Sequence, residues 1–179
     1  MDRRAYLQAV GGVAALAGCA GREPDRSPLT GTTGGSRATS DRSTIHERYE
    51  TTQVRVSTPA GEILGVVTAA VADTYDLRYL GLSDTETLPA DRGMLFVFES
   101  VADRSFVMRE MAFGIDIVYA DGDGTITTIH HAPAPEPDED GSTQRYPGRG
   151  QYVLEVTYGW ATDRGVETGD RLAFELPPD

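Results

Sequence analysis

Alternation of apolar and polar residues predicts β-strands over most of the chain after residue 45. Gln53–Thr58 alternates, and a Pro-Ala-Gly turn leads from it into Ile63–Ala72. Met94–Phe98 is apolar throughout, which is typical of a strand covered on both faces. The same criteria predict further strands at Ser105–Met108, Asp116–Ala120, Thr125–His131, Gln151–Thr157 and Arg171–Glu175.

Two short helices interrupt this series of strands. A helix over Thr74–Leu80 has Asp73 or Thr74 as its N-cap and a glycine directly after it. A second helix over Gly159–Arg164 carries the single tryptophan and is also followed by glycine. Many strands and few helices predict a mostly β (α+β) fold, a single small domain with a curved or barrel-like sheet over residues 45–179.

Two segments between the strands raise the question of function. Asp121–Gly124 reads Asp-Gly-Asp-Gly, like the start of a calcium loop, but it lacks the third acidic ligand and the closing glutamate. Its position between two predicted strands favours a hairpin turn. Ala132–Gly150 is rich in proline and acidic at its front, which predicts a long exposed loop that is either solvated or functional.

The N-terminal residues 1–19 have the order of parts found in an export signal. The Arg3-Arg4 pair is followed by an aromatic residue and a leucine, as in twin-arginine signals. The apolar run after it is too short to span a bilayer, and it ends in a Leu-Ala-Gly-Cys lipobox at Cys19. We therefore expect a lipid on Cys19 to hold the protein at the extracellular face of the membrane. The alternative is an ordinary amphipathic helix with a stray cysteine.

Residues 20–44 form a predicted tether. They are mostly Gly, Ser, Thr, Asp, Arg and Pro, with too little apolar surface to offset the entropy of ordering. Cys19 is the only cysteine in the chain, so the domain must fold without an internal disulfide.

The charge balance indicates the environment. All 16 basic residues are arginine, and they face 28 acidic residues, which gives a net charge of −12. Such an excess keeps a surface hydrated where concentrated salt screens repulsion, which favours a halophilic, archaeal origin. A GC-rich genome alone would explain the arginines but not the acidic excess. The sequence has no cluster of positive charge of the kind that binds phosphate backbones, so we do not expect a nucleic-acid partner.

A series of motifs in fixed order resembles the domain of unknown function 192 family (DUF192). The motifs are Leu77–Ser83, Leu88-Pro89, Arg92–Phe98, Phe106–Arg109, Ile115–Ile117, Asp121–Gly124, Tyr152–Val156 and Gly169-Asp170. The resemblance covers roughly Val66–Phe174. It implies a compact, mostly β domain, often exported, with no established biochemical activity and no known catalytic residues.

The chain departs from the family pattern at two places. Val107–Met111 stands where the family commonly has Trp-Met-Lys-Asn-Thr, and Gly114 stands where it has proline. Any chemistry that needed that tryptophan or amide is therefore in doubt here.

Charged residues within the apolar motifs are the candidates for a ligand pocket. A polar ligand could be bound by Arg78, Arg109, Asp116 and Glu155, together with His130. The guanidinium group of an arginine can form two parallel hydrogen bonds to a carboxylate or a phosphate. The alternative is a set of internal ion pairs that fix strand register. No nucleophile–base motif accompanies these residues.

The His130-His131 pair suggests a metal site as an alternative hypothesis. Neighbouring strand residues point to opposite faces, so both rings cannot easily bind one ion. One of them, with Asp116 and the thioethers of Met108 and Met111, would suit copper or a metal-dependent hydrolase. No spacing motif supports this alternative, and no cofactor is predicted. We expect a non-catalytic binding or accessory module whose partner is a small molecule or a surface protein.

Overall fold

The computed structural model describes residues 49–83 and 85–178, and the predicted export signal and the predicted tether lie outside the described residues. The strands are β1 (Thr51–Ser57), β2 (Ile63–Ala72), β3 (Arg92–Val107), β4 (Ile115–Ala120), β5 (Ile126–Ala132), β6 (Arg145–Thr157) and β7 (Arg171–Ala173). The helices are α1 (Tyr75–Leu80) and α2 (Trp160–Arg164). Within the described part of the chain, no helix is long and apolar enough to cross a membrane.

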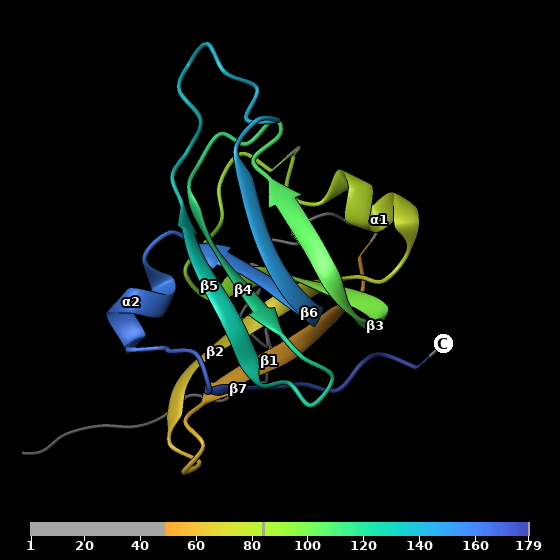
Figure 1. The fold of residues 1–179 in the computed structure, drawn as a ribbon, viewed down its shortest axis with the longest axis vertical. Helices are drawn as coiled ribbons and strands as arrows, with labels where there is room; N and C mark the ends of the chain where they lie inside the picture. Colours follow the sequence, from red (N-terminus) through yellow and green to blue (C-terminus); the bar gives the residue numbers. More distant parts are fainter. Residues whose placement is uncertain (1–48, 84, 179) are drawn as a thin grey trace, which may run out of the picture. The chain divides into compact units, whose positions relative to one another are not determined.

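The strands form one curled sheet in the order β5-β4-β6-β3-β2-β1-β7 (Figure 1). Neighbouring strands are antiparallel except for β2 and β3, which run parallel because the connection through α1 crosses back over the sheet. The two edge strands approach each other at one end, where Thr125 and Arg171 form an isolated bridge. This closure confirms the predicted curved, barrel-like sheet.

The sheet is packed on both faces, with one helix on each. Met94 and Phe96 belong to the core on the α1 side, which also contains Tyr119. Leu95 belongs to the core on the α2 side with Trp160. Alternate residues of a strand point to opposite faces, so the continuous apolar run in β3 is what a strand covered on both sides requires.

The predicted turns and caps are present. Thr74 caps α1 by accepting a hydrogen bond from the Leu77 amide at 3.3 Å. The carboxylate of Asp121 accepts hydrogen bonds from the amides of Asp123 and Thr125, and β4 and β5 pair on either side of it. The Asp-Gly-Asp-Gly segment is therefore a hairpin turn.

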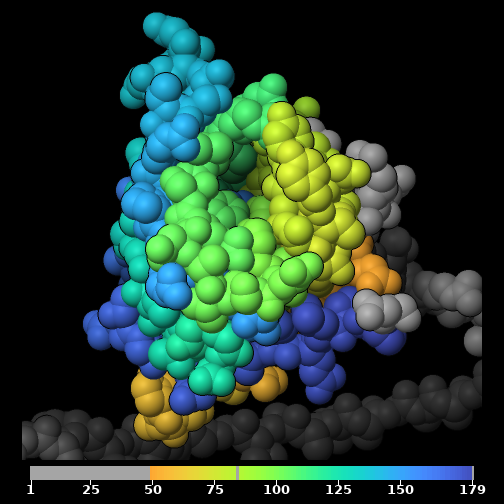
Figure 2. Space-filling model, turned by 45° about the vertical axis from the view of Figure 1, so that its right-hand side comes forward, coloured from red at the N-terminus to blue at the C-terminus, as the bar shows by residue number. Residues whose placement is uncertain are grey.

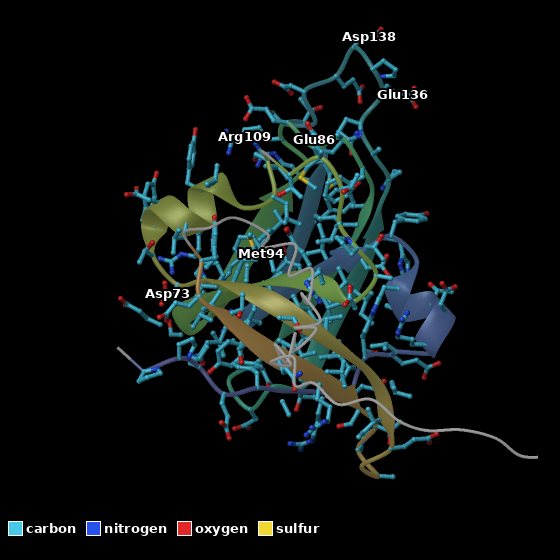
Figure 3. The ribbon with its side chains drawn as sticks, turned by 180° about the vertical axis from the view of Figure 1, so that it is seen from behind. Asp73, Glu86, Met94, Arg109, Glu136 and Asp138 are labelled. Carbon is cyan, nitrogen blue, oxygen red and sulfur yellow. The ribbon has the colours of Figure 1, made fainter. Side chains whose placement is uncertain are left out.

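The sequence reading was wrong about the extent of two strands. β3 is one strand of 16 residues that joins two predicted ones, with an irregularity between Val97 and Ala102. β6 begins at Arg145, inside the predicted loop, and its first residues pair with the second half of β3. This part of β6 is rich in glycine and arginine and shows no apolar alternation, so only its backbone pairing reveals it. The remaining loop carries Glu136 and Asp138 near its outer end (Figure 3).

Candidate ligand-binding pocket

A cavity of about 490 Å³ lies between α1 and the α1-facing side of the sheet. Figure 2 shows the hollow between the yellow-green surface around α1 and the green surface of β3. The helix, the irregularity in β3 and the segment after β3 enclose it. Its lining comes from α1 and the following turn, β3, the segment after β3, and one residue each of β4 and β6.

Aromatic rings form a fixed wall of the pocket. Phe96 and Phe106 meet edge to face with ring centroids 4.8 Å apart, and Phe106 contacts Tyr119 in the same way at 5.8 Å. The Tyr119 hydroxyl donates a hydrogen bond to the Tyr146 carbonyl at 2.6 Å, which fixes its ring. This wall offers an apolar surface to a ligand without needing to rearrange.

Two guanidinium groups lie over the same ring at the pocket. Those of Arg78 and Arg104 are 5.0 Å and 3.5 Å from the centroid of Phe98. Arg78 donates to the carbonyls of Asp73 and Val97 through Nη1 alone. Among the described residues, neither arginine has a carboxylate partner.

Arg104 is held in place by backbone carbonyls, and one of its donor nitrogens has no partner among the described residues. Its Nε donates to Gly150 at 3.1 Å and its Nη2 to Ser100 at 2.8 Å, which leaves Nη1 available. Burial, and then the charge of Arg78, lower the pKa of Arg104. An anion placed beside the two arginines would relieve that repulsion.

Arg109 links the segment after β3 to α1 at the edge of the pocket. Its Nη2 donates to the Tyr79 carbonyl at 2.7 Å, and the guanidinium lies 4.4 Å from the centroid of the Tyr79 ring. Its Nη1 is 3.3 Å from a carboxylate oxygen of Glu110, whose backbone has φ of 56°. Arg109 is thus a pocket-lining residue whose donors are largely used by its neighbours.

Glu155 also lines the pocket, and it is only 4% exposed. It lies on β6 between Met94 of β3 and Ile117 of β4, so its strand neighbours are apolar. No described residue forms a hydrogen bond or ion pair with its carboxyl group. Burial raises the pKa of Glu155 from 4.5 to about 8, so the group is mainly protonated at neutral pH.

The structure brings together three of the five residues proposed from the sequence. Arg78, Arg109 and Glu155 line this cavity, whereas Asp116 and His130 do not. The His130 Nε2 is 2.7 Å from the Pro147 carbonyl, and its ring packs near that of Tyr119. Sequence reasoning missed Arg104, because the polar segment between the two predicted strands gave no sign that β3 continues through it. Phe98 was assigned to a predicted strand, but its place beneath Arg104 appears only in the structure.

Asp116 is fully buried, and its carboxylate binds backbone amides at the start of α2. Its two oxygens accept hydrogen bonds from the amides of Gly159 at 3.0 Å and Ala161 at 2.8 Å. Nδ1 of His131, directly opposite on β5, is 2.7 Å from the same carboxylate. The geometry gives Asp116 the role of joining β4, β5 and α2.

The proposed metal ligands are divided between these environments. His131 is paired with Asp116, Met108 is fully buried in the core on the α1 side, and Met111 lines the pocket. The described residues contain no group of three or more His, Cys, Asp or Glu side chains placed to hold a metal ion.

Sequence and structure comparisons agree with this fold. The profile of the DUF192 family, described as uncharacterized ACR, matches residues 55–174. That match spans more than half of the chain, and the chain belongs to this family. None of the curated proteins matches the chain.

Two solved structures are similar to the domain. One, from Sinorhizobium meliloti 1021, is described as a "putative transcription regulator"; it has 29% identity and a TM-score of 0.62, and the match covers 70% of this chain and 95% of that one. The other, from Novosphingobium aromaticivorans DSM 12444, is a protein of unknown function with 24% identity and a TM-score of 0.58, covering 68% and 83% of the two chains. The second likeness supports the fold alone.

Proposed function

We propose that the domain is a non-catalytic binding module for a small anionic molecule with an apolar body. The observation that carries this proposal is the pair of guanidiniums on Phe98, Arg78 and Arg104, which have no carboxylate partner among the described residues. They lie at a cavity of about 490 Å³ with an aromatic wall, a size that suits a small organic ligand.

The donors left free on the arginines set the chemistry of the ligand. Arg78 keeps Nε and Nη2, and Arg104 keeps Nη1, after their bonds to backbone carbonyls. Carboxylate and phosphate oxygens match such groups, and charge-assisted hydrogen bonds to them are stronger than neutral ones. The phenylalanine rings would cover the apolar part of the same molecule.

A thermal-shift comparison in molar salt tests this proposal. We expect phenylacetate, octanoate or phenyl phosphate to raise the melting temperature, because a ligand that binds only the folded state stabilises it by RT ln(1 + [L]/Kd). The neutral counterparts phenylacetamide, octanamide and phenol should raise it less. Arg104→Met should remove the anion-dependent shift, whereas the matched exposed control Arg171→Met should keep it. Equal shifts with anions and neutral counterparts, or none with any of them, would contradict the proposal.

We place this module on the extracellular face of the membrane of a halophilic organism, held by a lipid on Cys19 after export through the twin-arginine route. The lipobox, the Arg3-Arg4 pair and the net charge of −12 support this placement. The acidic balance also favours a small ligand over nucleic acid, although one similar solved structure is described as a "putative transcription regulator".

Fractionation of cells tests the placement. Cys19→Ser should release the protein from the membrane fraction or leave an uncleaved precursor. Replacing both residues of the Arg3-Arg4 pair by lysine should retain it in the cytoplasm. If both variants fractionate like the parent protein, the export signal has been misread.

A further inference from the structure

Glu155 is a buried acid inside a pocket whose other ionisable groups are largely cationic. It is 4% exposed, it lines the cavity, and no described residue pairs with its carboxyl group. A carboxyl group that is largely removed from water, and that no described residue contacts, leaves a hydrogen bond for a ligand in the cavity to form. The side chain therefore marks a position where the ligand must carry a polar atom.

The ionisable groups around Glu155 come from several elements. Tyr119 of β4 interacts with it electrostatically, and burial raises the pKa of this tyrosine to about 12, so it stays neutral. The cavity is also lined by Asp103 and Arg104 of β3, Arg78, Tyr75 and Tyr79 of α1, and Arg109 after β3. Asp103 forms an ion pair with Arg149 at 3.0 Å, so the remaining charged side chains give the pocket lining a net positive charge.

We propose that Glu155 acts as a protonated hydrogen-bond donor to an oxygen of the bound anion, so that the site binds its ligand in neutral solution and releases it in alkaline solution. This inference rests on the proposed function and adds a specificity-determining residue to it. The proton of the carboxyl group lies in the hydrogen bond while the ligand is bound. When the group ionises, that proton passes to solvent and the resulting carboxylate repels the anion.

The charges in the pocket favour this role over pairing with a cation. Arg78, Arg104 and Arg109 all line the cavity with Glu155, so a cationic ligand would meet three positive side chains. Burial alone accounts for the raised pKa of Glu155, which agrees with the absence of a close cation at its carboxyl group. An anion pairs with the guanidiniums, and a neighbouring anion favours the protonated form of Glu155 over the carboxylate.

The pH dependence of anion binding tests the role of Glu155. We would measure the Kd of phenylacetate by calorimetry in molar salt at pH 7 and pH 9.5, where the probe is ionised throughout. If only the protonated form binds, the wild-type Kd rises ~30-fold over this interval, given a pKa of about 8. Glu155→Gln keeps a neutral donor at both values, so its Kd should change by less than about threefold. Circular dichroism at each pH would verify that every variant is folded.

A second variant separates hydrogen bonding from simple neutrality. Glu155→Leu has no donor, and it should bind phenylacetate more weakly than Glu155→Gln at both pH values, by about 10-fold. A wild-type Kd that stays flat or falls with pH, or an equal rise in Glu155→Gln, would overturn the role of Glu155 while leaving the pocket intact. If the wild type binds none of the anions used above at any pH, the proposed function itself fails, and this inference with it.

Discussion

Removing the charge of Asp116 should destabilise the fold more than any surface change of the same kind. The fully buried carboxylate accepts hydrogen bonds from the Gly159 and Ala161 amides and contacts His131 at 2.7 Å. In Asp116→Asn the amide group can replace only one of the two acceptor oxygens. At least one buried N–H then faces another donor.

The magnitude follows from the bonds that are lost. A hydrogen bond to a charged group contributes about 1.5–3 kcal/mol, and a buried donor left unpaired costs about 1–3 kcal/mol. We therefore expect Asp116→Asn to lower the free energy of unfolding by ~3–5 kcal/mol. The assay is equilibrium urea unfolding in molar salt, followed by circular dichroism.

Asp123→Asn is the matched control, because Asp123 is exposed in the β4–β5 turn and its side chain makes no hydrogen bond to another described residue. It should change the free energy of unfolding by less than about 0.5 kcal/mol. If Asp116→Asn costs no more than this control, Asp116 does not stabilise the junction of β4, β5 and α2.

Three further predictions concern packing, pH and salt. Gly65→Ala should lower the free energy of unfolding by ~1–3 kcal/mol in a urea titration, because a Cβ there would lie 2.6 Å from the Trp160 ring; an unchanged midpoint would show that the ring moves aside. The raised pKa of Glu155 means that the folded state binds more protons than the unfolded state between pH 4.5 and about 8. Wild-type stability should therefore fall relative to Glu155→Gln as pH rises through this window, by up to ~1.4 kcal/mol per pH unit, and parallel curves would refute the burial argument. The net charge of −12 predicts a melting temperature that rises steeply from dilute buffer to molar salt, whereas a flat response would show that the acidic excess is incidental.

The sequence by itself determined the fold class and most of the elements. Alternation in Gln53–Thr58, the apolar run Met94–Phe98 and the Asp-Gly-Asp-Gly turn each act over a few residues, through side-chain period and backbone preference. Such local patterns can be read from the sequence without knowing which strands lie side by side in the sheet. The ordered motifs also led to the DUF192 family, to which the chain belongs.

The tertiary structure alone decided which charged residues share a site. Glu155 and Asp116 both interrupt apolar runs, yet the register of β4 against β6 pairs Ile117 with Glu155 and sends the two acids to opposite faces of the sheet. One therefore lines the pocket and the other caps α2. Arg104 entered the pocket only because β3 continues past its irregularity to pair with β6. These placements depend on long-range strand pairing, which a local pattern of side chains does not encode.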